Sequence, residues 1–237
     1  TLHHFTHPQW FDDLGGWERR RNIDLFVAFS ERVFEEYGAT VPFWCTINEP
    51  ELFATQGWFV SMFPPGKRDA VLCARVIANL LEAHARTYHA LKRLPGGAEV
   101  QVGLVKNIFQ FDPYRRANLF DWFASRALDE VFNASIIRAL KTGHFSAHVP
   151  GLVTFERAIP RVRGAGDFIG LNYYSHFYVK TQLDREMPFD MVQRASDLQT
   201  DMPYPIYAEG FHRALLLGVA VAGIDDVLGF AVDQSFE

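Results

Sequence analysis

Hydrophobic and polar positions along this chain follow two spacings, one typical of buried strands and the other of amphipathic helices. Apolar runs predict strands over residues 41–48, 100–105 and 167–174, and a shorter one over residues 1–5. Helical spacing of apolar positions predicts helices over residues 22–37, 69–94, 118–141 and 208–217. Strands separated by long helices indicate an α/β fold with parallel pairing through helical crossovers.

Polar or ionisable residues stand at the carboxyl end of each predicted strand. They are His4, Asn48, Glu49, Lys106, Asn107, Asn172, Tyr173 and Tyr174. In parallel α/β folds the carboxyl ends of neighbouring strands meet at one edge of the sheet, where ligands bind and chemistry takes place. These side chains are therefore candidates for a common site.

Glu49 is the sharpest candidate for chemistry. It ends an apolar strand and precedes Pro50, which lacks a backbone donor and predicts an extended backbone at Glu49. A carboxyl group held against Trp44 or Phe43 in a partly dry cleft would favour its neutral form, as a general acid requires. The alternative is a structural glutamate paired with an arginine, and local features leave both readings open.

Composition narrows the class of protein. The 237 residues are 49% hydrophobic and 15% aromatic, enough for a sizeable core. The net charge of −5 gives no electrostatic footprint for nucleic acid, and no apolar run is long enough to predict a membrane-spanning helix. With only Cys45 and Cys73, a reducing cytoplasmic location is favoured. The start at Thr1, without an initiator methionine or signal peptide, predicts a fragment.

Several motifs resemble those of glycoside hydrolase family 1, the β-glucosidase family. Residues 46–50 match its Thr-x-Asn-Glu-Pro motif, and residues 1–10 resemble its segment Thr-Leu-x-His-(Trp or Phe)-x-x-Pro-x-Trp. Residues 168–174 are similar to its sixth-strand motif, and residues 201–211 to the segment before its seventh strand. Because these motifs keep the order of the family over residues 1–217, the chain is identified as a member.

The resemblance implies a (β/α)8 TIM barrel that hydrolyses β-glycosidic bonds with retention, without a metal or organic cofactor. Here the barrel is expected to be incomplete, lacking the first two strands of the family and an intact seventh strand. Residues 1–237 would form a single partial TIM-barrel domain, in which residues 218–237 are a divergent or truncated C-terminal segment.

The resemblance also implies roles for individual residues. Glu49 falls on the acid/base position, which protonates the leaving oxygen and then deprotonates the incoming water. Asn48 falls on the residue that hydrogen-bonds the sugar 2-hydroxyl, and His4 on a histidine that binds glycone hydroxyls. Asn172 and Tyr174 fall on the pair that faces the acid/base and the nucleophile, respectively.

Other positions are expected to be structural or to depart from the family pattern. Packing or structural roles are expected for His3, His7, Trp44, Tyr173, His84 and Glu209. Glu51 departs from the family, in which tryptophan commonly follows Asn-Glu-Pro. This departure leaves the aglycone side of the site open.

The nucleophile of the family is not found. It lies in an Ile-Thr-Glu-Asn-Gly motif that ends the seventh strand, where this chain has residues 218–226. On that alignment Val221 occupies the nucleophile position, and no glutamate lies between Glu209 and Glu237. A faint resemblance of the chain end to the eighth-strand region makes Glu237 a candidate sugar-binding residue; an altered reading frame or a frayed terminus is the alternative.

A retaining enzyme needs two carboxyl groups about 5–5.5 Å apart, so little or no activity is expected from this chain. Asp225, Asp226 or Asp233 would substitute only if its carboxyl reached the anomeric carbon. The expected ligand is a β-glycoside or oligosaccharide, with glucose, galactose, fucose and 6-phospho sugars all open.

Two other classes of function are alternatives to the glycosidase. One is a non-catalytic sugar- or partner-binding protein on the same fold. The other is an unrelated partial barrel with a metal. His3, His4 and His7 lack the spacing of a ligand set on a rigid element, which disfavours a metal.

Overall fold

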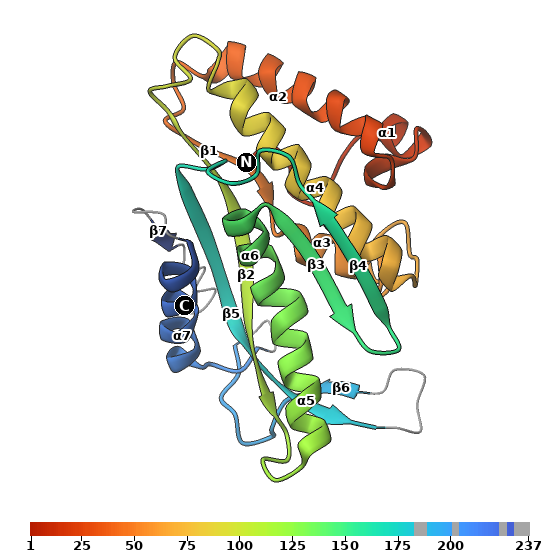
Figure 1. The fold of residues 1–237 in the computed structure, drawn as a ribbon. Helices are drawn as coiled ribbons and strands as arrows, with labels where there is room; N and C mark the ends of the chain where they lie inside the picture. Colours follow the sequence, from red (N-terminus) through yellow and green to blue (C-terminus); the bar gives the residue numbers. More distant parts are fainter. Residues whose placement is uncertain (183–188, 201–203, 223–226, 230–237) are drawn as a thin grey trace.

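The computed structural model describes residues 1–182, 189–200, 204–222 and 227–229. Its helices are α1 (Gln9–Asp13), η1 (Gly16–Glu18), η2 (Arg20–Asn22), α2 (Ile23–Tyr37), α3 (Pro50–Trp58), α4 (Ala70–Leu91), α5 (Leu119–Leu128), η3 (Asp129–Ala134), α6 (Ser135–Thr142) and α7 (Ala208–Ala222). Its strands are β1 (Phe43–Asn48), β2 (Gln101–Pro113), β3 (His144–Val149), β4 (Val153–Ala158), β5 (Phe168–Thr181), β6 (Phe189–Val192) and β7 (Val227–Gly229). Figure 1 shows how they are arranged.

The main sheet is parallel through its centre, as predicted. β1 pairs with β2, β2 with β5, and β5 with the short β7, all in parallel. A single parallel bridge between His3 and Ile47 adds the start of the chain beyond β1, and β6 pairs antiparallel with the far end of β5. Within the described residues the sheet stays open (Figure 1), as in part of a (β/α)8 barrel.

Strand β5 shows how the sequence separates the two faces of the sheet. Side chains alternate between faces along a strand. Ile169, Leu171 and Tyr173 belong to an apolar cluster with Ala214 of α7. Asn172, between two of these residues, therefore points to the opposite face. The predicted packing role of Tyr173 is confirmed.

Helix α4 is buried on most of its sides because it lies between α2 and the sheet (Figure 1). Its first turn is capped by Asp69, whose carboxylate accepts a hydrogen bond of 2.8 Å from the backbone N–H of Leu72. Trp17 and Phe26 pack in the same core cluster as the helix. This core anchors the start of the chain beside β1.

Some elements were missed by the hydrophobic pattern. Helix α3 and the β3–β4 hairpin form in stretches for which no element was predicted. Strands β2 and β5 run well beyond the predicted ends at residues 105 and 174. The helix predicted over residues 118–141 is present as α5, η3 and α6, with a π-helical turn in the middle.

His3 lies in the aromatic core rather than in a polar site. Its ring centroid is 4.9 Å from that of Phe53 and 5.2 Å from that of Trp17, and both ring nitrogens are buried without a partner. Burial lowers the pKa of His3 to about 3, with smaller effects of His7 and His4 in the same direction. The packing role predicted for His3 is confirmed.

Glycine is required at position 103, where β2 approaches β5. A Cβ atom there would lie 2.5 Å from the carbonyl oxygen of Phe168 and 2.7 Å from its ring. We expect Gly103→Ala to lower the free energy of unfolding by about 1–3 kcal/mol in urea titrations, because the two strands must move apart. Gly166→Ala is the control, since its Cβ would lie 3.6 Å from the same carbonyl oxygen. Equal stability of the two variants would contradict this account.

The buried His3 predicts a pH dependence of stability. The unfolded chain binds a proton at this residue near pH 6.5, whereas the folded chain does so only near pH 3. Its contribution is therefore complete above pH 6.5 and is lost as the pH falls, by about 2 kcal/mol at pH 5. We expect His3→Phe to flatten the fall in unfolding free energy between pH 7 and pH 5.

His84 remains in that variant, and burial lowers its pKa to about 4. The slope with pH should therefore shrink in His3→Phe without disappearing. A slope as steep as that of the unmodified chain would argue against a buried neutral His3.

Candidate active site

Glu49 stands where β1 turns into α3. Its backbone N–H donates to the carbonyl of Val105 (2.8 Å), and its own carbonyl accepts from the N–H of Phe53 (3.0 Å), which starts the helix. Its backbone is left-handed, with φ +46° and ψ +62°. The expected extended geometry is wrong, because Pro50 takes the first helical position and the chain must turn sharply before it. Such a conformation costs about 1–2 kcal/mol in a residue with a side chain.

The carboxylate of Glu49 is buried and accepts two hydrogen bonds at one oxygen. Asn172 Nδ2 donates to Oε1 at 2.5 Å, and Tyr174 Oη donates to the same oxygen at 3.2 Å. Asn172 Nδ2 also lies 3.3 Å from Asn48 Oδ1, and Asn48 Nδ2 lies 3.3 Å from His4 Nε2. The structure thus joins these predicted site residues in one polar network at the carboxyl ends of the strands.

The electrostatics of the network keep its tyrosines protonated. Burial, followed by the negative charge of Glu49, raises the pKa of Tyr174, so its hydroxyl remains a donor to the carboxylate. Burial and the same charge raise the pKa of Tyr204, whose ring lies 5.9 Å from that of Tyr174. Tyr204 was not a candidate from the sequence, because it lies outside the predicted strands.

Asn107 was one of the strand-end candidates in the sequence, but no particular role was predicted for it. It pairs in register with Asn172 on the neighbouring strand, so the two side chains leave the sheet on the same face. Asn107 is fully buried, and both polar atoms of its side chain lack a protein partner. Its place at a strand end was the only signal in the sequence.

Glu51 forms a buried ion pair with Lys106. The ammonium lies 2.9 Å from Glu51 Oε1, and both side chains are essentially inaccessible to solvent. The same oxygen accepts a 2.8 Å hydrogen bond from the N–H of Asn107. Burial raises the pKa of Glu51 and lowers that of Lys106, and each partner opposes that shift in the other. Glu51 stands where tryptophan commonly follows Asn-Glu-Pro in the family. Its buried carboxylate is neutralised here by the buried ammonium of Lys106.

Two aromatic residues do not lie where the sequence suggested. Trp44 and Phe43 were expected against Glu49, but they start β1 whereas Glu49 follows its last residue. Trp44 packs with Phe34 and donates from Nε1 to the carbonyl of Val41. The expectation that they dry the carboxyl group is wrong; the side chains hydrogen-bonded to it are those of Asn172 and Tyr174.

Other histidines and Glu209 lie outside the network. His7 pairs with Asp12 at 2.7 Å, and His84 is buried with Nδ1 2.7 Å from Thr46 Oγ1. Glu209 is exposed and pairs with Arg213 on α7. These contacts agree with the structural roles expected for them.

The region expected to hold the nucleophile differs from the alignment made on the sequence. Val221 falls within α7, and the next strand starts only at Val227. The aligned position of Val221 at a strand end is therefore wrong, because the helix continues through the alanine-rich segment. Asp225, Asp226, Asp233 and Glu237 lie outside the described residues. Within the part of the chain that the structure describes, Glu49 supplies the only carboxylate hydrogen-bonded in the network.

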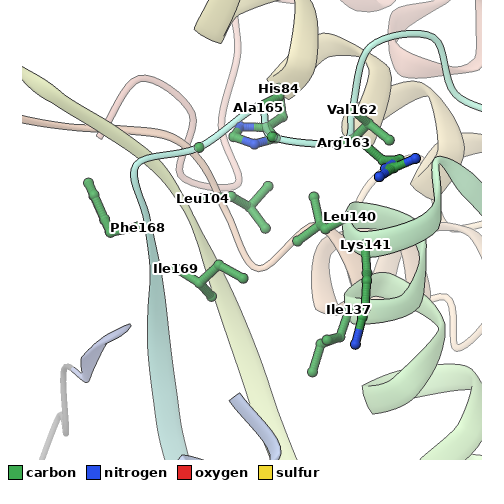
Figure 2. A pocket seen from close by; sticks show the side chains of 12 residues that line it. His84, Leu104, Ile137, Leu140, Lys141, Val162, Arg163, Ala165, Phe168 and Ile169 are labelled. Atoms are coloured by element: carbon green, nitrogen blue, oxygen red, sulfur yellow. The ribbon is translucent and has the colours of Figure 1, made fainter. Parts of the chain in front are cut away.

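A cavity of about 310 Å³ lies at the other end of the strands. Figure 2 shows Leu104, Leu140 and Ile169 gathered around it, with His84 at its edge. Because Leu104 and Ile169 stand near the amino ends of β2 and β5, this cavity is separate from the network at the carboxyl ends.

Among the described residues, no three His, Cys, Asp or Glu side chains are grouped as metal ligands would be. No helix in the described part of the chain has the length and apolar character needed to cross a membrane.

Curated relatives of the chain include β-glucosidases. β-Glucosidase A of Acetivibrio thermocellus is 26% identical over 231 residues, covering 92% of this chain and 50% of that protein. β-Glucosidase A of Thermotoga maritima is 29% identical over 220 residues, covering 90% of this chain and 48% of that protein. The chain thus spans about half the length of the curated relatives it matches.

Solved structures show the same relationship. The family 1 β-glucosidase from Thermotoga maritima superposes with a TM-score of 0.81 at 28% identity, over 95% of this chain and 51% of that one. A β-glycosidase from Pyrococcus horikoshii gives a TM-score of 0.79 at 29% identity, over 92% and 49%. The sequence profile of glycosyl hydrolase family 1 matches residues 1–218. With its fold and its sequence agreeing over this span, the chain belongs to glycosyl hydrolase family 1.

Proposed function

We propose that this chain carries the proton-donating half of a retaining β-glycosidase site of the β-glucosidase type, with Glu49 as general acid and base. The observation that carries the proposal is the buried Glu49 carboxylate, which Asn172 and Tyr174 hold by hydrogen bonds at one oxygen. The second oxygen is left to meet the glycosidic oxygen. A fixed carboxyl group is what proton transfer to a leaving alcohol requires.

In the proposed reaction, Glu49 gives its proton to the glycosidic oxygen as the bond to the anomeric carbon breaks. The resulting carboxylate then takes a proton from water. Asn48 and His4 bind sugar hydroxyls, using an amide and an imidazole that are joined only by a 3.3 Å contact. Asn172 and Tyr174 keep the carboxyl group oriented.

Low turnover by this chain is part of the proposal. Its sequence has no glutamate between Glu209 and Glu237 to act as nucleophile. Loss of a nucleophile that acts together with other groups costs several powers of ten in rate. The ligand is a β-glycoside or an oligosaccharide. A cytoplasmic location is supported by the free thiols of Cys45 and Cys73, and by relatives named cytosolic β-glucosidase in human and guinea pig.

A sugar-binding protein without turnover is the second candidate function. It is favoured by one observation, that the residues proposed to bind sugar are joined in a network whose only described carboxylate is Glu49. The two functions differ in one respect: catalysis requires Glu49 to donate a proton, whereas sugar binding alone does not.

Azide tests the role of Glu49 because it can replace a missing nucleophile. It attacks the anomeric carbon of phenyl β-glucoside, the bond to the phenolic oxygen breaks, and that oxygen takes the proton of Glu49, giving glucosyl azide and phenol. We expect Glu49→Gln to slow azide-dependent release of phenol by about 100-fold or more. Release of 2,4-dinitrophenol, which leaves without a proton, should change by less than about tenfold.

Glu36→Gln is the matched control, because Glu36 is an exposed residue of α2. Equal loss of both leaving groups in Glu49→Gln would contradict proton donation. Glucoside binding with no cleavage of either substrate in azide would favour the sugar-binding protein.

Binding of an iminosugar tests the glycone side separately. A solved structure of the Thermotoga maritima enzyme contains deoxynojirimycin. We expect this chain to bind deoxynojirimycin, and His4→Ala to weaken the binding about tenfold by removing hydrogen bonds to sugar hydroxyls. Titration calorimetry measures the effect, with the exposed His144→Ala as control. Unchanged affinity in His4→Ala would rule out its glycone role.

A further inference from the structure

Helix α5 has the reverse of the usual amphipathic arrangement. It packs beside the carboxyl ends of β2 and β5 (Figure 1), and its two buried residues, Asp121 and Ser125, are polar. A helix on the surface of a domain normally turns its apolar stripe to the core. The large apolar side chains of α5 are exposed instead: Leu119 by 70%, Phe120 by 62%, Trp122 by 43% and Phe123 by 60%. These four residues are called the α5 face.

The buried carboxylate of Asp121 holds the helix in this orientation. It accepts hydrogen bonds from Arg115 Nε at 2.8 Å and Arg115 Nη2 at 2.7 Å. It also accepts from the backbone N–H of Thr181 at 2.9 Å and from the Thr181 hydroxyl at 2.6 Å. Turning the α5 face inward would break these bonds, so its exposure is fixed by the contacts of the opposite face.

Positive charge flanks the α5 face. Arg126, in the last turn of the helix, has its guanidinium 5.5 Å from the centre of the Trp122 ring. Arg116 is exposed in the turn before the helix, where the ammonium of Lys180 lies 5.5 Å from the ring centre of Tyr114. Neither Arg116 nor Arg126 forms a salt bridge with another described residue. Their charges are therefore available to an anionic partner.

We propose that the α5 face rests on the surface of an anionic lipid bilayer. Its apolar side chains enter the boundary between headgroups and acyl chains, and the flanking arginines lie among the lipid phosphates. Helices that lie in the plane of a membrane carry Trp, Phe and Leu on one side and Lys or Arg beside them. Such contact needs no membrane-spanning helix, and it does not depend on the glycosidase function proposed above.

Charge selects a bilayer over a second copy of the chain. In a symmetric dimer the α5 face would meet itself, which brings the positive charges of Arg116 and Arg126 together. No exposed acidic residue on α5 could pair with them, because Asp121 is buried and Glu130, beyond the helix, is paired with Arg138. The net charge of the chain is −5, so the attraction is confined to this face and orients it toward the bilayer.

Co-sedimentation of the 237-residue chain with lipid vesicles tests the proposal. One set of vesicles is pure phosphatidylcholine, and the other contains about 30% phosphatidylserine, which gives an anionic surface. We expect binding to the anionic vesicles to be about tenfold tighter or more. The absence of binding to the anionic vesicles would overturn the proposal.

A double variant tests the apolar contact. Leu119→Ser with Phe123→Ser removes two exposed side chains four positions apart on α5, and we expect it to weaken vesicle binding about tenfold or more. Leu25→Ser with Phe29→Ser is the matched control, because it removes the same two exposed side chains at the same spacing on α2. Circular dichroism establishes that both variants are folded. Equal binding by the two would overturn the proposal.

A second double variant tests the charges. Arg116→Gln with Arg126→Gln should lose most of the preference for anionic vesicles. Arg21→Gln with Arg93→Gln removes two exposed arginines of other elements and should keep the preference. An undiminished preference in the first pair would contradict the proposed contact with phosphates.

Tryptophan fluorescence reports which face touches the bilayer. Lipids brominated in their acyl chains should quench Trp122, so Trp122→Phe should lose most of the quenching while it keeps vesicle binding. Trp10→Phe is the control, since Trp10 is also exposed but lies on α1. Undiminished quenching in Trp122→Phe would overturn the proposal. So would a dimer that dissociates on Leu119→Ser with Phe123→Ser in a chain that does not bind vesicles, since the α5 face would then belong to a second copy.

Discussion

The hydrogen bond between Asn172 and Glu49 joins two residues 123 positions apart, and the polar network depends on it. It forms only because β2 lies between β1 and β5 with all three strands parallel. A shift of one residue in the β2–β5 pairing would move Asn172 to the other face of the sheet. The register is therefore the constraint from which the geometry of the site follows.

The left-handed backbone of Glu49 is a second condition for this geometry. Glu49 is the single residue between β1 and α3, and its backbone is strained. The helix begins with Pro50, which has no backbone N–H that needs an acceptor. Non-glycine residues keep such conformations where the surrounding structure holds them, and they gather at functional sites. Here the N–H of Glu49 is fixed to β2 and its side chain to β5.

The sequence predicted those parts of the fold in which local pattern and tertiary structure agree. Strands β1, β2 and β5 have apolar runs because both faces of their central parts are covered, and α2 and α4 have broad apolar faces. Helix α3 was missed because its apolar and small residues do not form a clear stripe. The β3–β4 hairpin was missed because each of its strands has only six residues and no continuous apolar run; its order comes from strand pairing and from Phe145, Ala147 and Val153, which pack in the main core.

For the site, strand ends and family motifs identified the members but not their contacts. Which donor reaches Glu49 depends on strand register, and its backbone conformation depends on how α3 docks, so neither can be read from neighbours in sequence. Trp44 was expected to shield the Glu49 carboxyl group from water because the two residues are close in the sequence. A strand separates its two ends in space, and that is why the inference failed.

The buried pair of Glu51 and Lys106 has a consequence for how this chain can evolve. Removing either partner alone leaves an uncompensated charge in the interior, which costs about 3–5 kcal/mol, a large part of the stability of a typical domain. A route from this pair to the tryptophan common in the family therefore cannot pass through single exchanges of either residue without a deep loss of stability. A change at Glu51 is therefore energetically coupled to Lys106, a residue 55 positions away in the sequence.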